Sequence, residues 1–248
     1  MKQQQFKIIF LLMLFANMLS SKGQETNESL NFKDTDNLKI ISSVVEHDMD
    51  LQQLIFSITV KGKAGKSVPE KVGQLDGAPV LGYVFPTNLS STDVGFSKTE
   101  GIVALALTSH PDFDDTPLWD ENTNAVYDDD GIIWHPHWVV LVDDKRVAGG
   151  LSVKQFDTED GTVKLPPTNP GMPMYMDSPG FPVFTSENSI KVVVPQYRMN
   201  HKNDFNFDAV TAYMQVNTTQ EGLPMLGVYQ VYSIASEDLS LPYQPIKK

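Results

Sequence analysis

Hydrophobic residues along the chain recur in short runs rather than in helical stripes. After the first two dozen residues, no window of about twelve carries an apolar i, i+3, i+4, i+7 stripe free of Pro and Gly. The runs are rich in Val, Ile, Tyr and Phe and are separated by Gly, Pro, Asn and Asp, which is typical of β-strands joined by turns. The predicted strands are residues 54–60, 80–85, 102–107, 132–142, 190–194, 209–216 and 226–234. The pattern predicts an all-β fold, as a single antiparallel β-sandwich or flattened barrel with long loops at 62–79 and 156–188.

The run 132–142 places two histidines on one face of a strand. Because side chains alternate between the two faces, His135 and His137 point the same way, and Trp134 and Trp138 point the opposite way. An i, i+2 separation of roughly 7 Å lets two imidazoles converge on one Zn²⁺ or Cu²⁺ ion. The alternative is that both histidines are half-buried polar residues satisfied by neighbouring carbonyls.

A metal site needs at least a third ligand, and the remaining histidines supply the candidates. His110 opens an acidic segment as His-Pro-Asp, and His201 lies close to Met199. His47 is a weaker candidate because its flanks are typical of the end of a strand. The predicted metal ligands are therefore His135, His137, His110 and His201.

The segment 112–130 contains eight Asp and Glu residues and no Lys or Arg. Such a density of carboxylates is costly unless they stay solvated or gain a cation. Asp120, Asn122 and Asn124 imitate the first three ligands of an EF-hand loop, but Gly131 stands where that loop needs a bidentate Glu. We reject an EF-hand, and we expect a solvated acidic loop in preference to an irregular Ca²⁺ site.

Met172, Met174 and Met176 alternate within a Pro-rich stretch. Thioethers are soft ligands that suit Cu(I), so this spacing fits a copper segment. Methionine also fills irregular gaps in apolar cores, and that interpretation is favoured here.

Composition narrows the classes of function. The formal net charge is −12, and the field of such a chain repels polyanions, so we expect neither nucleic acid nor an anionic membrane face as a partner. The absence of Cys excludes disulfides, thiolate metal sites and Cys nucleophiles. No Gly-x-Ser-x-Gly motif occurs, so a serine hydrolase of that type is not indicated.

The N-terminal residues have the pattern of a secretory signal. Lys2 and Lys7 precede a short apolar run that is about half as long as the roughly 20 residues of a bilayer span. We expect a cleavable signal peptide at residues 1–23, a flexible leader at 24–36 and a single β domain at 37–248. After cleavage no membrane span is expected, and the protein would be secreted or periplasmic.

These patterns support three hypotheses of function. The first is an exported, non-catalytic β domain that binds a small ligand or a metal ion through its His-x-His strand. The second is a metal-dependent secreted enzyme of hydrolase or oxidase type, with Asp128 or Asp130 as general base. The third is a glycan-binding module that stacks sugars on Trp119, Trp134 and Trp138.

Overall fold

The computed structural model describes residues 35–111, 123–126 and 133–248. The chain forms an all-β fold in which the helical segments of the described residues are short 3-10 turns. The elements are η1 (Thr35–Leu38), β1 (Ile40–Asp48), β2 (Gln53–Val60), β3 (Pro79–Pro86), η2 (Ser91–Val94), β4 (Ile102–Ser109), β5 (His135–Asp143), β6 (Leu151–Val153), β7 (Met176–Asp177), β8 (Val183–Ser186), β9 (Ser189–Pro195), η4 (Gln196–Met199), β10 (Val210–Val216), β11 (Leu226–Ile234) and β12 (Ile246–Lys247).

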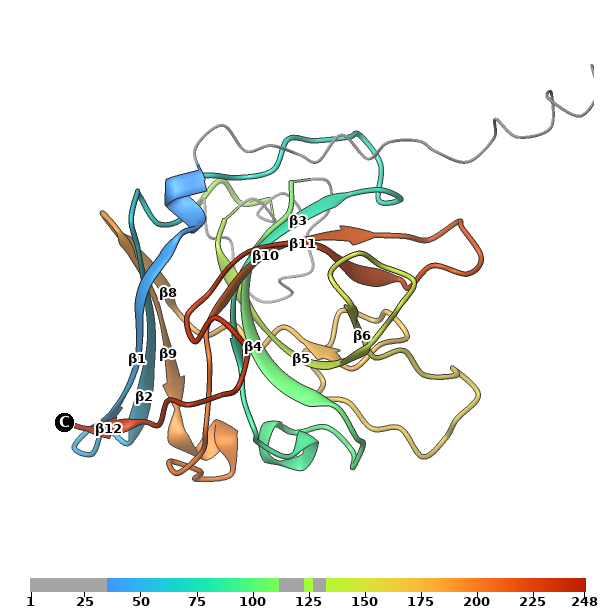
Figure 1. Ribbon diagram of the computed structural model, residues 1–248. Helices are drawn as coiled ribbons and strands as arrows, with labels where there is room; N and C mark the ends of the chain where they lie inside the picture. Colours follow the sequence, from blue (N-terminus) through green and yellow to red (C-terminus); the bar gives the residue numbers. More distant parts are fainter. Residues whose placement is uncertain (1–34, 112–122, 127–132) are drawn as a thin grey trace, which may run out of the picture. The chain divides into compact units, whose positions relative to one another are not determined.

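Six strands close into a barrel. The larger sheet runs in the order β4-β3-β10-β11-β6-β5-β7, and an additional β4–β5 pairing joins its two sides. The closing strands are antiparallel, with Ile102 opposite Leu141 and Thr108 opposite His135. The short strand β7 lies beyond the ring, as an extra neighbour of β5. The barrel is therefore built from β3, β4, β5, β6, β11 and β10, which occupy the right-hand side of Figure 1.

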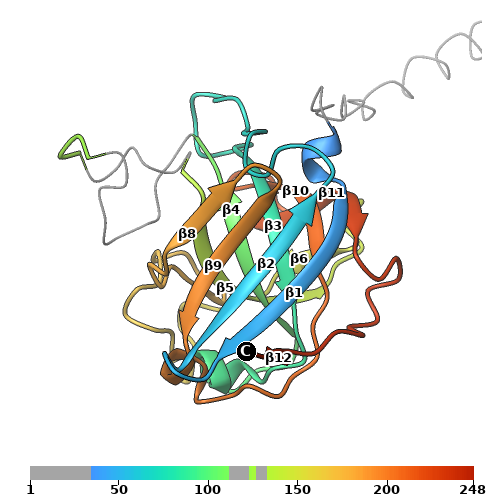
Figure 2. The same ribbon diagram turned by 90° about the vertical axis from the view of Figure 1, so that its left-hand side faces the viewer.

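A second sheet packs against the outside of this barrel. Its strand order is β12-β1-β2-β9-β8, and β12 pairs with β1 in parallel while the other pairs are antiparallel. Figure 2 shows β8, β9, β2 and β1 side by side in front of the barrel strands. The predicted sandwich and the predicted barrel are both present, because one layer of the sandwich is itself a closed barrel.

Two apolar cores result from the alternation of side chains along the barrel strands. The outer faces meet the five-stranded sheet, where the Phe56 ring of β2 lies 5.3 Å from the Phe85 ring of β3. The inner faces line the barrel and include several small residues, such as Ala106 and Ala212. Small inward side chains leave space inside the barrel that large ones would fill.

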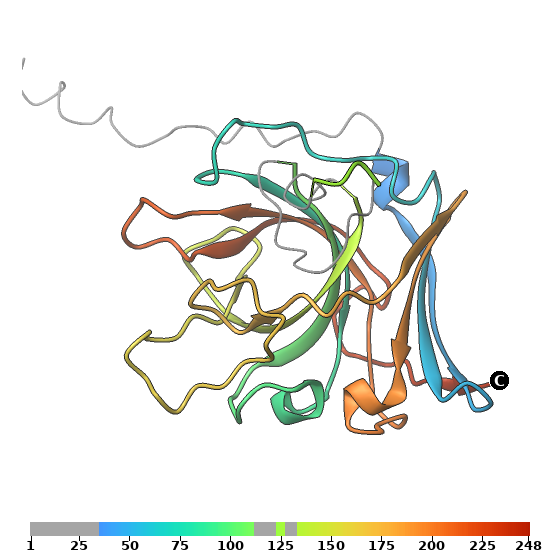
Figure 3. The ribbon, with the colours of Figure 1, turned by 180° about the vertical axis from the view of Figure 1, so that it is seen from behind.

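The segment between β6 and β7 extends away from the five-stranded sheet, as Figure 3 shows in gold. It returns onto its own start, because Phe156 N–H donates to the Pro173 carbonyl and Tyr175 N–H donates to the Lys154 carbonyl. The segment thereby brings Met174 and Met176 into the barrel wall, where both are buried.

The predicted signal peptide at residues 1–23 lies outside the described residues, as does most of the leader predicted for residues 24–36. Thr35 and Asp36, the last two residues of that range, belong to η1. Among the residues that the structure does describe, no helix combines the length and the apolar character needed to cross a bilayer.

Candidate metal centre

Two neighbouring barrel strands bring three histidines together. On β4, Ala106 and Thr108 face the barrel interior, and the alternation continues to His110, directly after the strand ends. On β5, His135 lies opposite Thr108 and His137 lies opposite Ala106. The register of this one strand pair therefore gathers all three imidazoles at one end of the barrel wall.

The imidazoles of His110, His135 and His137 form a compact, buried group. One ring nitrogen of each lies within 4.8 Å of the others, close enough that the three could hold a single ion. The Nε2 atoms of His110 and His135 are 2.8 Å apart. The three side chains belong to residues no more than 3% exposed, so an ion among them would be shielded from solvent.

Hydrogen bonds fix the ring of His135 in the orientation of a metal ligand. Its Nδ1 lies 2.6 Å from the carbonyl oxygen of Ile133, and because a carbonyl only accepts, Nδ1 carries the proton. In the neutral ring the lone pair then lies on Nε2, the nitrogen 2.8 Å from His110 Nε2. Metal-binding histidines in proteins are commonly held in this way, with the second nitrogen donating to a carbonyl or carboxylate.

His137 is held by a similar contact. Its Nδ1 lies 3.1 Å from Ser178 Oγ, so Nε2 is the nitrogen that we assign to an ion. Ser178 is itself 1% exposed and follows the short strand β7. Two of the three rings thus have an outer partner at Nδ1 that holds the ring in place.

The opposite face of β5 anchors this part of the strand to the main core. Trp134 donates from Nε1 to the Gly65 carbonyl at 2.8 Å, and its ring lies 4.9 Å from the Tyr83 ring. Burial raises the pKa of Tyr83 to about 12, and its hydroxyl donates to the Asn37 carbonyl at 2.8 Å. These contacts hold the backbone directly before His135 in place without occupying the face that carries the imidazoles.

A buried carboxyl lies next to the Ser178 contact. Asp177 is 1% exposed and accepts a hydrogen bond of 2.5 Å from the Thr168 hydroxyl. Burial raises the pKa of Asp177, although the hydrogen bond from Thr168 and the charge of Arg198 oppose that change. The Asp177 carboxyl therefore joins β7 to the segment that contains Thr168.

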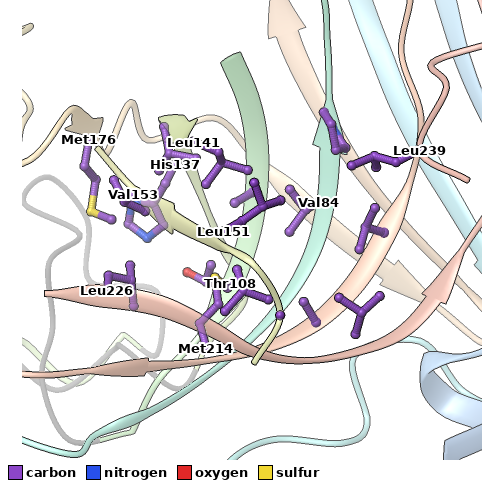
Figure 4. Close-up of a pocket in the computed structure, with 18 of the residues that line it drawn as sticks. Val84, Thr108, His137, Leu141, Leu151, Val153, Met176, Met214, Leu226 and Leu239 are labelled. Atoms are coloured by element: carbon purple, nitrogen blue, oxygen red, sulfur yellow. The ribbon is translucent and has the colours of Figure 1, made fainter. Parts of the chain in front are cut away.

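The histidine group borders a chamber inside the barrel. The chamber has a volume of about 140 Å³, and Thr108 and His137 contribute the polar side chains of its described lining. Figure 4 places His137 and Met176 at one end of the chamber and Leu239 at the other. A smaller hollow of about 20 Å³ shares Thr108, His137 and Met176 with the chamber and reaches His110.

The structure separates the four predicted ligands into two groups. His110, His135 and His137 converge, whereas His201 is exposed just after η4, with a backbone φ of 58°. His47 is buried in β1 opposite Lys247, in the other sheet. Neither His201 nor His47 is a member of the histidine group found in the described part of the chain.

Other predicted site residues lie elsewhere or outside the described ranges. The eight acidic residues of segment 112–130, with Asp128 and Asp130 among them, lie outside the described residues, as does Trp119. The calcium alternative for that loop therefore remains a prediction. Trp134 and Trp138 are 9% and 1% exposed and fill the core, so they offer no open platform for a sugar.

Two side chains that were not among the predicted site residues, Thr108 and Ser178, complete the surroundings of the histidines. Thr108 is two positions before His110, and the alternation of β4 was the signal that places both on one face. Ser178 carried no such signal, because its contact with His137 joins residues 41 positions apart.

No protein-family model matches the chain, and no curated protein or solved structure is significantly similar to it. The chemistry of the site therefore rests on its own geometry.

Proposed function

We propose that this protein binds one transition metal ion through the Nε2 atoms of His110, His135 and His137. The observation that carries the proposal is the convergence of three buried imidazoles from two paired strands within 4.8 Å. The fixed Nδ1–H of His135 adds support, because it places the lone pair of that ring on Nε2, the nitrogen next to His110.

The donor set favours Zn²⁺ or Cu²⁺. Imidazole nitrogen suits these ions, whereas Ca²⁺ and Mg²⁺ take oxygen ligands. Met174 and Met176 lie on the same side of the barrel, but both are packed in its apolar interior, so thioether ligation is not part of the proposal.

The experiment is a metal titration of protein purified without a His tag. We expect one Zn²⁺ or Cu²⁺ per chain by calorimetry and by elemental analysis. The His135→Ala/His137→Ala variant removes two of the three ligands, so we expect its affinity to fall by more than about 100-fold, beyond what loss of an outer partner costs.

His201→Asn serves as the matched control, because His201 is exposed, lies outside the group, and Asn tolerates its positive φ. This variant should bind metal as the unaltered protein does. Circular dichroism and thermal unfolding show whether each variant is folded. Equal metal binding by the double variant, or no stoichiometric binding by any folded sample, would overturn the proposal.

A metal-dependent enzyme is the second candidate, and one feature favours it. Three protein ligands leave a fourth position on a tetrahedral ion, which is the arrangement of catalytic zinc sites. A water molecule there is acidified by the ion and becomes a nucleophile near neutral pH. Hydrolysis of a panel of activated esters by the Zn²⁺-loaded protein, lost in the double histidine variant, would support this candidate.

We also propose that the protein works after export, in the secreted or periplasmic space. The proposal is supported by the two lysines, short apolar run and small residues at the start of the sequence. N-terminal sequencing of protein recovered outside the cytoplasm tests it, and we expect the mature chain to begin at Gln24.

A further inference from the structure

The chamber inside the barrel has the size and lining of a small-molecule site. Its volume of about 140 Å³ is close to that of an engineered cavity of about 150 Å³ that binds benzene. Its described lining is apolar except at Thr108 and His137. A six-membered ring or a short alkyl chain fits this volume, and a larger body does not.

The chamber is polar at one end only. Thr108 is 4% exposed, and its Oγ1 has no hydrogen-bond partner within the described part of the chain. An unsatisfied buried hydroxyl costs about 1–3 kcal/mol, so the position favours a ligand that can accept its proton. Figure 4 shows Thr108 near His137 and Met176, at the end where the chamber meets the hollow that reaches His110.

The chamber wall on β11 includes an exposed residue. Val231, on β11, lines the chamber and is 39% exposed, so the chamber wall reaches the surface at this residue. Leu239 lines the end of the chamber away from His137 and belongs to the segment after β11.

The charge of the proposed metal centre favours a ligand with an anionic group at the end that reaches the ion. Three neutral imidazoles leave the full double charge of a divalent ion uncompensated, and the apolar surroundings make that charge costly. An anion on the fourth coordination position offsets the cost. A carboxylate does so with one oxygen and accepts the Thr108 proton with the other.

We propose that the barrel binds a small carboxylate with an apolar body. The body occupies the chamber, the carboxylate binds the metal ion, and the Thr108 hydroxyl donates to it. This inference rests on the metal site proposed above, because the ion supplies the charge that the carboxylate balances.

The test titrates benzoate and toluene into the Zn²⁺-loaded and metal-free protein. Both probes carry one ring, and only benzoate carries a carboxylate. We expect benzoate to bind the Zn²⁺-loaded protein at least about tenfold more tightly than the metal-free protein, whereas toluene should bind both equally. The same samples are assayed for bound Zn²⁺ before each titration.

Two variants test the contributions of the apolar body and of the carboxylate separately. Ala212, which pairs with Gly82 of β3, lines the chamber but not the hollow at His110. Ala212→Leu fills the chamber, so it should abolish binding of both probes and leave Zn²⁺ binding intact. Thr108→Val keeps the shape and removes the hydroxyl. It should weaken benzoate about tenfold, as the loss of a hydrogen bond to a charged group does, and leave toluene unchanged.

The outcomes distinguish the two proposals. Stoichiometric Zn²⁺ with no effect of the ion on benzoate affinity would overturn the carboxylate inference and leave the metal site intact. Benzoate binding that survives Ala212→Leu would also overturn it, because the body would then lie outside the chamber. The absence of Zn²⁺ binding would overturn both.

Discussion

The Nε2 atoms of His110 and His135 lie 2.8 Å apart inside the barrel wall. Because His135 donates from Nδ1 to the Ile133 carbonyl, its neutral ring accepts at Nε2, and His110 Nε2–H is the donor of this contact. Two nitrogens on a tetrahedral zinc ion, each at about 2.0–2.1 Å, are about 3.3 Å apart. If an ion replaces the shared proton, the distance between the two nitrogens thus has to increase by only about 0.5 Å.

The hydrogen bond between Ser178 and His137 should tune the affinity for metal. Ser178→Ala removes the partner that orients the His137 ring, so we expect metal affinity to fall about tenfold, as for other outer partners. Ser178→Thr keeps the hydroxyl and should restore most of the affinity. A calorimetric titration measures both variants, and unchanged affinity in Ser178→Ala would mean that packing alone holds the ring.

The Asp144 carboxylate should stabilise the turn between β5 and β6 at neutral pH. It accepts from Arg146 Nε at 2.8 Å, Arg146 Nη2 at 2.6 Å and Ser152 Oγ at 2.8 Å. Arg146 is about half exposed, which weakens its share through solvent screening. We expect Asp144→Asn to lower the free energy of unfolding by about 2 kcal/mol at pH 7, measured in urea.

The contribution of Asp144 should also depend on pH in a defined direction. The hydrogen bond from Arg146 holds the pKa of the folded Asp144 carboxyl well below its ordinary value of 3.8. The stabilisation is therefore fully present about one pH unit above the ordinary pKa of 3.8. It is lost as the pH falls toward the lower pKa of the folded state. The stability difference between the parent and Asp144→Asn should shrink from pH 5 to pH 2.

Asp143 provides the control for this measurement. It is the exposed neighbour of Asp144, so Asp143→Asn should change stability by less than about 0.5 kcal/mol at either pH. Equal effects of the two substitutions would show that the buried hydrogen bonds of Asp144 do not carry its stabilisation.

Phe56 should be among the residues whose loss most weakens the packing between the sheet and the barrel. Its ring is fully buried and lies 5.3 Å from the Phe85 ring and 6.5 Å from the Trp138 ring. Phe56→Ala leaves a cavity there and should cost about 4 kcal/mol of unfolding free energy. Phe184→Ala, at a side chain 56% exposed, should cost less than about 1 kcal/mol, and a similar loss in both would contradict this account.

Much of the barrel could be predicted because its strands are long and apolar. The predicted runs overlap β2, β3, β4, β5, β9, β10 and β11. Strands β6, β7, β8 and β12 are two to four residues long, too short to leave a periodic pattern. β1 was marked only by a strand end near His47, because its exposed Ser42 and half-buried Ser43 interrupt the apolar pattern.

The candidate site was predictable only in part. Alternation along β5 placed His135 and His137 on one face, and the structure confirms that division from Trp134 and Trp138. The choice between His110 and His201 depended on the register of β4 against β5, which a period of two does not specify. The same limit left the choice between a sandwich and a closed barrel open, since pairing partners are set by long-range packing.

X-ray absorption at the zinc edge of the Zn²⁺-loaded protein tests the central claim most directly. The account predicts three imidazole nitrogens and one oxygen at about 2.0–2.1 Å, with the scattering signature of three rings, and loss of that signature in His135→Ala/His137→Ala. A shell of oxygen ligands alone, or an unchanged spectrum in the double variant, would contradict the assignment of His110, His135 and His137 as the metal site.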